Sequence, residues 1–369
     1  MIIDYRPVNL EDSLVDYPDH LELPVVMQRE MTTYLHRSLP MCIMLTNDNY
    51  RGWFNTNFVQ IFSNKLENGE IELNYLTPRD GYCEIAEVIS LGYPLLDHVP
   101  DFVSYMIECI NKGYYFVVHI DEFYIPDKGM YEETHFVHAS LCYGYDMTKR
   151  EFYGIGFDED MTFRKMTFSF DAFREAYEES KSNYMPEAFW CEWSAVQLIK
   201  PKTPYVAFPF DLRRFTDELS DYLTSRADMY KYYSFEFDVN NAVFGMDVYK
   251  LVEEKLEEMK QGDIYIDYRA IHLLAERSRG LVDRFSYISK LYDISDELKN
   301  DFKKYEEIGE RFNKVRLRFM AEFSHVEKRE QINEHKREEL DWTIKELRGL
   351  SRDEKEILGK IHSELLLIK

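Results

Sequence analysis

The chain has 369 residues and a formal net charge of −23, and 45% of its residues are apolar and 15% aromatic. A chain of this length usually forms about two domains, and this aromatic content is typical of packed cores rather than of disordered proteins. The acidity disfavours nucleic acid and anionic membranes as partners, and neither a membrane-spanning apolar run nor a signal-peptide pattern is present, so we expect a cytoplasmic protein.

The acidity is concentrated in the N-terminal part of the chain. Up to residue 205 there are 16 Lys and Arg against 33 Asp and Glu, a net −17, whereas the remainder has 29 against 35, a net −6. Such a field attracts a cationic or amine-bearing partner. The five cysteines are an odd number with no C-x-x-C pair, so neither a disulfide framework nor a four-thiolate zinc site is expected.

The first predicted elements are helical. Residues 1–40 contain several prolines and no sustained periodicity, which predicts an irregular lead-in. The apolar spacing of residues 53–65 predicts a buried helix. Residues 100–112 predict a second helix, because Pro100 suits a first turn and Gly113 suits a stop.

A change of period then marks a sheet. Runs rich in β-branched and aromatic residues predict strands at 114–121, 136–146, 150–158 and 161–169. Ser169 or Asp171 could cap a following helix that reaches Tyr177. From about residue 210 apolar residues recur at spacings of three and four, which predicts helices to the end of the chain. We therefore predict an α+β fold, with an antiparallel sheet in residues 1–205 and a helical bundle in residues 206–369.

The densest polar cluster is HIDEFYIP at residues 119–126, followed by HFVH at residues 135–138. Strand alternation places His119 and Asp121 on one face, while His138 opens the next strand, so the two strands could build one site. For the residues between them (Glu122, Tyr124 and His135) a solvated loop is the alternative, and His138 could equally be a structural histidine.

The sequence gives little support for a metal site, a phosphate-binding loop or a serine-hydrolase site. A zinc site of His119, His135, His138 and Cys142 has suitable ligand types, but its spacing matches no standard pattern, so no metal is expected. Glycine-rich phosphate loops and a G-x-S-x-G elbow are both absent from the sequence, and we expect no cofactor.

The phrases DEFYIP, HFVHASLCYGYD, REFYGIGFDED and FSFDAFREAY, in this order, resemble the N-terminal domain of the butirosin-biosynthesis acyltransferase family. That family is related to papain-like peptidases, and the resemblance covers about residues 40–200. It implies a papain-like fold in which a Cys opens a central helix, a His opens a later strand and an acid on the next strand orients the His. A neighbouring imidazolium makes such a thiol reactive by lowering its pKa.

The resemblance implies specific roles for residues of this chain. His138 matches the base and Asp158 the orienting acid, and Asn57 or Gln60 could donate to an oxyanion. The sequence departs from the family where the nucleophile should stand, because Trp53 begins the predicted helix. The nearest thiol is Cys42, which lies in the apolar run MCIML and is expected to be a buried structural residue.

We therefore predict an acyl- or aminoacyl-transfer, amide-forming protein of bacterial peptide natural-product biosynthesis. Its partners would be a small-molecule or carrier-bound acyl donor and an amine acceptor, and its C-terminal helices could form a homodimer. The predicted catalytic residues are His138, Asp158 and Asn57, and the predicted substrate-binding residues are Trp53, Gln60, Asp121, Glu122, Tyr124 and His135.

The alternative is a non-catalytic, degenerate papain-like binding or scaffold protein in such a pathway. Two contacts are expected in either case. His138 should hydrogen-bond Asp158, and Trp53 should face His138 and close the floor of a groove.

Overall fold

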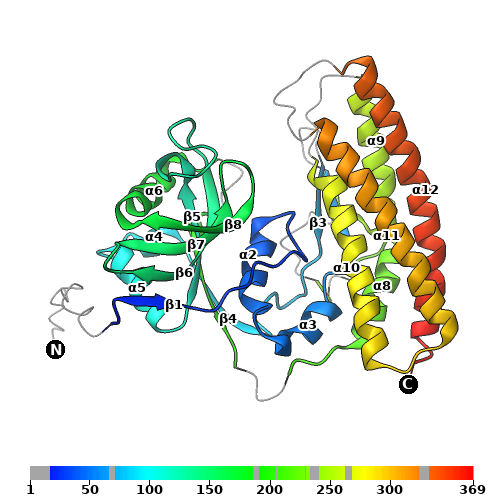
Figure 1. The fold of residues 1–369 in the computed structure, drawn as a ribbon, viewed down its shortest axis with the longest axis horizontal. Coiled ribbons are helices and arrows are strands. Elements are labelled where there is room, and N and C mark those ends of the chain that lie inside the picture. The colour runs from blue at the N-terminus through cyan, green and yellow to red at the C-terminus, as the bar shows by residue number, and fades with distance from the viewer. Residues whose placement is uncertain are drawn as a thin grey trace. The chain divides into compact units, whose positions relative to one another are not determined.

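The computed structural model describes residues 17–65, 71–185, 191–203, 207–228, 230–232, 241–261, 268–323 and 332–368. The chain forms two compact units, the first made of Met1–Asp48 with Tyr82–Tyr205 and the second of Asn49–Gly81 with Val206–Lys369. The fold class is α+β, with antiparallel sheets followed by helices (Figure 1). The units differ from the predicted division at residue 205, because residues 49–81 belong to the second unit.

The first unit contains an antiparallel sheet with the strand order β4-β9-β5-β6-β7-β8, and β1 pairs with β6 beside this path. Its strands are β1 (His20–Glu22), β4 (Ala86–Leu91), β5 (Tyr115–Asp121), β6 (Val137–Asp146), β7 (Glu151–Phe157), β8 (Phe163–Ser169) and β9 (Val196–Pro201). The four strands predicted between residues 114 and 169 are confirmed as β5 to β8. Strands β1, β4 and β9 were not predicted.

Alternation along the strands divides the side chains of this sheet between two faces. Phe116, Val118 and Ile120 of β5 enter a core that also contains buried residues of α5 (Phe102–Asn111) and α6 (Phe170–Asn183). Helix α2 (Leu35–Met44) packs on β5, β6, β7 and β9. No residue of α2 belongs to the α5 and α6 core, so α2 covers the other face (Figure 1). Shorter helices of this unit are α4 (Tyr93–Leu96), η3 (Glu122–Tyr124) and α7 (Cys191–Ser194).

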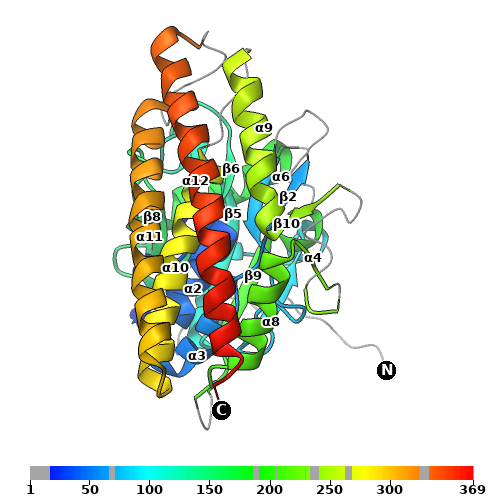
Figure 2. The ribbon, with the colours of Figure 1, turned by 90° about the vertical axis from the view of Figure 1, so that its right-hand side faces the viewer.

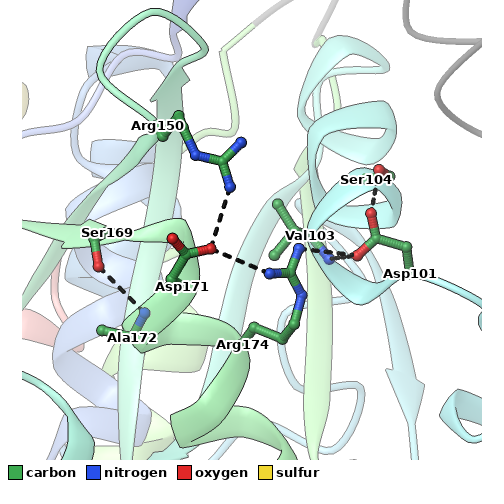
Figure 3. A network of polar contacts seen from close by, with 8 residues as sticks. All are labelled: Asp101, Val103, Ser104, Arg150, Ser169, Asp171, Ala172 and Arg174. Carbon is green, nitrogen blue, oxygen red and sulfur yellow. Dashed lines mark hydrogen bonds and ion pairs between the residues drawn. The ribbon is translucent and has the colours of Figure 1, made fainter.

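The two longer helices of this core begin with side-chain caps, which confirms the predicted helix at 100–112 and the cap at Ser169. Asp101 accepts from Val103 N at the start of α5, and Ser169 accepts from Ala172 N at the start of α6 (Figure 3). Arg174 contacts both Asp101 and the first-turn Asp171 of α6, so a chain of ion pairs joins the two helix starts. An acceptor at an N-cap satisfies amides that the helix itself leaves unpaired.

The second unit combines a small sheet with a helical bundle. Its sheet has the order β10-β2-β3, and its elements are η2 (Asp48–Tyr50), α3 (Arg51–Thr56), β2 (Ile61–Lys65), β3 (Ile71–Tyr75), α8 (Leu212–Leu223), β10 (Val243–Phe244), η6 (Gly245–Asp247), α9 (Val248–Gln261), α10 (Arg269–Leu291), α11 (Asp296–Phe323) and α12 (Glu334–Leu365). Helix α11 packs on α10 and α12, and α12 also packs on α8 and α9 (Figure 2). The predicted C-terminal bundle is present.

The predicted helix at 53–65 is wrong beyond Thr56. Phe58 has a positive φ of 62°, after which the chain continues as β2. The partners of β2 are β3 and the distant β10, so its pairing depends on residues that local periodicity does not register.

One buried carboxylate of α12 joins that helix to four other helices of the second unit. Glu354 Oε1 accepts from Arg277 Nη1 at 3.0 Å and from the Tyr305 hydroxyl at 2.6 Å. Its Oε2 accepts from the hydroxyls of Tyr222 and Tyr249, each at 2.7 Å. A buried charge is tolerated when it is paired and hydrogen-bonded in this way. None of the helices in the described part of the chain combines the length and apolarity needed to cross a bilayer.

Candidate functional site

His138 and Glu122 form a hydrogen-bonded pair at one end of the first unit's sheet. His138 Nδ1 lies 3.0 Å from Glu122 Oε1, and the His138 side chain is 30% exposed while that of Glu122 is 7% exposed. Burial raises the pKa of Glu122, but the hydrogen bond from His138 and the nearby charge of Lys128 outweigh it and hold this pKa below its usual value. An ionised carboxylate only accepts, so Nδ1 carries the proton that it donates, and Nε2 is the nitrogen left for proton transfer.

The sheet register explains why these two side chains meet. His138 pairs with Ile120 across β5 and β6, so both side chains lie on the face covered by α5 and α6. Glu122 follows Ile120 by two residues and therefore starts on the same face. His138 and Glu122 therefore come from the adjacent ends of neighbouring strands.

A second imidazole is held in the same way. His135 Nδ1 lies 2.8 Å from Asp121 Oδ2, and Asn183 Nδ2 donates to the same oxygen at 3.0 Å. Asp121 is fully buried and also accepts from the backbone amides of Phe123 and Phe136. The His135 ring stacks on Phe123, with centroids 4.4 Å apart. Asp121, predicted to bind substrate, instead fixes His135 and the loop that carries it.

The expected pairing of His138 with Asp158 is not what the structure has. Asp158 Oδ1 accepts from the amides of Asp160 and Thr162, and its Oδ2 accepts from Arg164 Nε at 2.5 Å. This carboxylate therefore closes the turn between β7 and β8, and Glu122 is the carboxylate that hydrogen-bonds His138. Tyr124 lies near His135, with ring centroids 5.9 Å apart.

Three predicted site residues, Trp53, Asn57 and Gln60, belong to the second unit. Trp53 is 3% exposed and packs edge-to-face on Phe58. Asn57 donates from Nδ2 to Trp53 O at the end of α3, and Gln60 donates to Arg226 O. These amides make internal contacts, which argues against the predicted oxyanion role. The expected approach of Trp53 to His138 stays a prediction.

The four buried cysteines of the first unit are poor nucleophiles. Burial raises the pKa of Cys42 and of Cys191 to about 11, and burial also raises the pKa of Cys109 and Cys142. Cys42 is fully buried, as predicted, and lies near the end of α2 rather than at its start. Cys83 is the exposed one of the five.

Helix α2 packs on the first unit's sheet, whereas Trp53 belongs to α3 of the second unit. The resemblance requires a thiol at the start of such a helix, but α2 begins with Leu35 and His36 after Tyr34. It also covers the face opposite that of Ile120 and His138. The nucleophile that the resemblance implies is therefore missing from α2 as well as from α3.

The zinc alternative also lacks a suitable cluster. His119 Nδ1 lies 3.3 Å from Ala195 O, and burial lowers the pKa of His119 to about 4. Among the residues described here, no group of three or more His, Cys, Asp or Glu could hold a metal ion.

Sequence reasoning missed Lys128 and Asn183, which complete the two pairs. Lys128 stands in the phrase PDKG, which reads as an exposed turn. The available signal was Gly156 in the middle of a strand run, since an interior strand glycine often marks the close approach of another group.

Comparison of the chain with protein-family models and with curated proteins gives no match in either case. The resemblance to the butirosin acyltransferase family therefore stays a prediction that rests on the sequence phrases.

Proposed function

We propose that the protein transfers an acyl or aminoacyl group to an amine and so forms an amide, with His138 as the general base. The observation that carries the proposal is the His138–Glu122 pair. A buried carboxylate fixes the imidazole through Nδ1, and the ring is partly exposed, as a base that meets substrate must be. The sequence resemblance supplies the reaction class, and the net −17 up to residue 205 suits a cationic amine acceptor.

The proposed step needs no cysteine when the acyl group arrives as a thioester, either carrier-bound or on a small molecule. The amine nitrogen attacks the thioester carbonyl, its proton passes to His138 Nε2, the N–C bond forms, and the C–S bond breaks as the thiolate leaves with the electron pair. Holding the two reactants together supplies much of the rate gain in such a transfer. The setting would be bacterial peptide natural-product biosynthesis, as the resemblance implies.

The test uses a panel of acyl-pantetheine thioesters and amines, with products identified by mass spectrometry. His138→Gln should lower the rate of amide formation by about 10²- to 10⁴-fold, the usual contribution of a general base. His98→Gln is the matched control, because it removes an exposed imidazole of the same unit that belongs to neither pair. Equal rates for the His138→Gln variant and the native protein would refute the proposed base.

A non-catalytic binding role is the second candidate, and the cysteines favour it. Burial raises the pKa of Cys42 and of Cys142, so neither offers the thiolate that the related enzymes use. In this case the native protein would retain an amine or acyl compound without forming product. Equilibrium dialysis of the same panel separates the two functions.

A further inference from the structure

Lys128 is a buried cation next to the His138–Glu122 pair. The residue is 2% exposed, and its Nζ lies 3.2 Å from Glu122 Oε1. The same oxygen accepts from His138 Nδ1 at 3.0 Å. A buried ammonium costs several kcal/mol unless it is paired, so a lysine is not expected here without a partner that needs it. One carboxylate oxygen thus links a buried cation to a partly exposed imidazole.

The sheet provides space for this ammonium at a glycine. A Cβ on Gly156 of β7 would lie 2.7 Å from Lys128 Nζ and 3.4 Å from Ser140 Oγ. At Gly154, two residues earlier, a Cβ would instead meet the Phe168 ring at 2.1 Å. On this face of β7, the Phe168 ring therefore occupies the space at Gly154, and the Lys128 ammonium occupies the space at Gly156.

The backbone holds Lys128 in this position. Asp127 has a positive φ of 65°, which turns the chain inward just before Lys128. Lys128 N donates to Ile125 O at 3.3 Å, and Glu159 N donates to Asp127 O at 3.0 Å. The loop is thus fastened to the turn that follows β7.

Several charged and titratable groups face the ammonium from the neighbouring elements: Glu122 of η3, His138 and Cys142 of β6, Asp158 after β7, and Arg164 of β8 through its contact with Asp158. Burial lowers the pKa of Lys128 below its usual value, and the charge of Glu122 offsets part of this effect. Ser140 Oγ, on the same face, is buried with no hydrogen-bond partner in the described parts of the chain.

We propose that Lys128 is the positioning residue of the His138 base. Its ammonium fixes the Glu122 carboxylate and balances its charge. The carboxylate then orients the imidazole through Nδ1, and Nε2 stays free to accept a proton. Gly156 is needed for this arrangement, because any side chain at this position would displace the Lys128 ammonium. This role rests on the proposed function, because that function makes His138 the base. The effect of Lys128 on His138 can nevertheless be measured without following the reaction.

The experiment follows the ring nitrogens of His138 by two-bond ¹H–¹⁵N NMR across pH in the native protein, Lys128→Met, Glu122→Gln and the double variant. In Lys128→Met the unbalanced carboxylate should hold the ring proton more tightly, and the midpoint of the His138 titration should rise by about one pH unit or more. In the double variant the midpoint should return to that of Glu122→Gln. Lys149→Met, which removes an exposed ammonium from the same unit, should change nothing.

An unchanged midpoint and tautomer in a folded Lys128→Met protein would overturn the proposal. Should that variant not fold, Gly156→Ala gives the second test, because it displaces the ammonium and keeps its charge. A folded Gly156→Ala protein in which His138 titrates with the native midpoint would equally overturn it. Failure of amide formation in the native protein, with the expected NMR shifts present, would refute the reaction and leave the positioning role standing.

Discussion

Glu218 of α8 is a buried carboxyl group whose replacement should make the second unit more stable at neutral and alkaline pH. Its Oε2 accepts from Val59 N at 3.2 Å, and Arg214, Arg284 and Tyr232 are the charged and titratable groups that interact with it. Burial raises the pKa of Glu218 from 4.5 to about 7, against the lowering effect of the Val59 hydrogen bond and of the two arginines.

The magnitude follows from the difference in pKa between the folded and unfolded chain. A shift from 4.5 to about 7, at about 1.4 kcal/mol for each pKa unit, amounts to about 3 kcal/mol. Because the folded pKa is the higher one, the stabilising contribution is complete below pH 4.5 and is lost as the pH rises through about 7. Glu218→Gln has no ionisable group here, and its amide oxygen can still accept from Val59 N. At pH 8 the variant should be more stable than the native protein by up to about 3 kcal/mol, and near pH 4.5 the two should be similar.

Urea unfolding at pH 4.5, 6, 7 and 8, followed by circular dichroism at 222 nm, measures this difference because the long helices of the second unit dominate the signal. Asp217→Asn is the matched control, since Asp217 is an exposed carboxylate on the same helix. Its pH dependence of stability should follow that of the native protein. The reasoning fails if Glu218→Gln keeps the native pH dependence, or if it is the less stable protein at pH 8.

Four other variants test the packing and the buried groups. Glu354→Gln leaves Arg277 buried without its counter-charge and should cost about 3–5 kcal/mol in urea unfolding. Gly154→Ala places a Cβ 2.1 Å from a neighbouring ring and should cost about 1–3 kcal/mol by overpacking, whereas Gly359→Ala, with no atom within 4 Å, should gain up to about 1 kcal/mol in its helix. The lowered pKa of His119, about 4, means that its stabilising effect is present above pH 6.5 and is lost as the pH falls towards 4, so His119→Gln should unfold less steeply with acid over this range.

The elements that the sequence predicted correctly are those whose partners are close in the chain. Strands β5 to β8 follow one another and pair as neighbours, so period-2 runs bounded by turns were sufficient. Strand β4 pairs with β9, more than 100 residues later, and its sequence AEVISL is short and partly charged. No local pattern distinguishes such a strand from a loop.

Helix α2 was missed for a different reason. Pro40 lies inside it, and a proline usually ends a helix, so residues 1–40 were read as irregular. Here Leu39, Met41 and Ile43 are fully buried around the proline, and tertiary packing compensates for the lost hydrogen bond. The expected central helix was therefore placed at Trp53, which lies in α3 of the second unit.

At this site the sequence pointed to the histidine but not to the carboxylate that holds it. His138 was identified because titratable residues gather where two neighbouring strands end, which is a local signal. The choice between Glu122 and Asp158 as its partner depended on what else each carboxylate binds. Asp158 is committed to the amides two and four residues ahead of it, a local turn contact that Asp readily makes. Glu122 has a longer side chain and pairs with Lys128 of the loop that follows it, so its carboxylate is the one that can hold an imidazole. The partner of His138 is therefore decided by the other groups that each carboxylate binds. One of these groups is the buried Lys128, whose position follows from the fold and not from the local sequence.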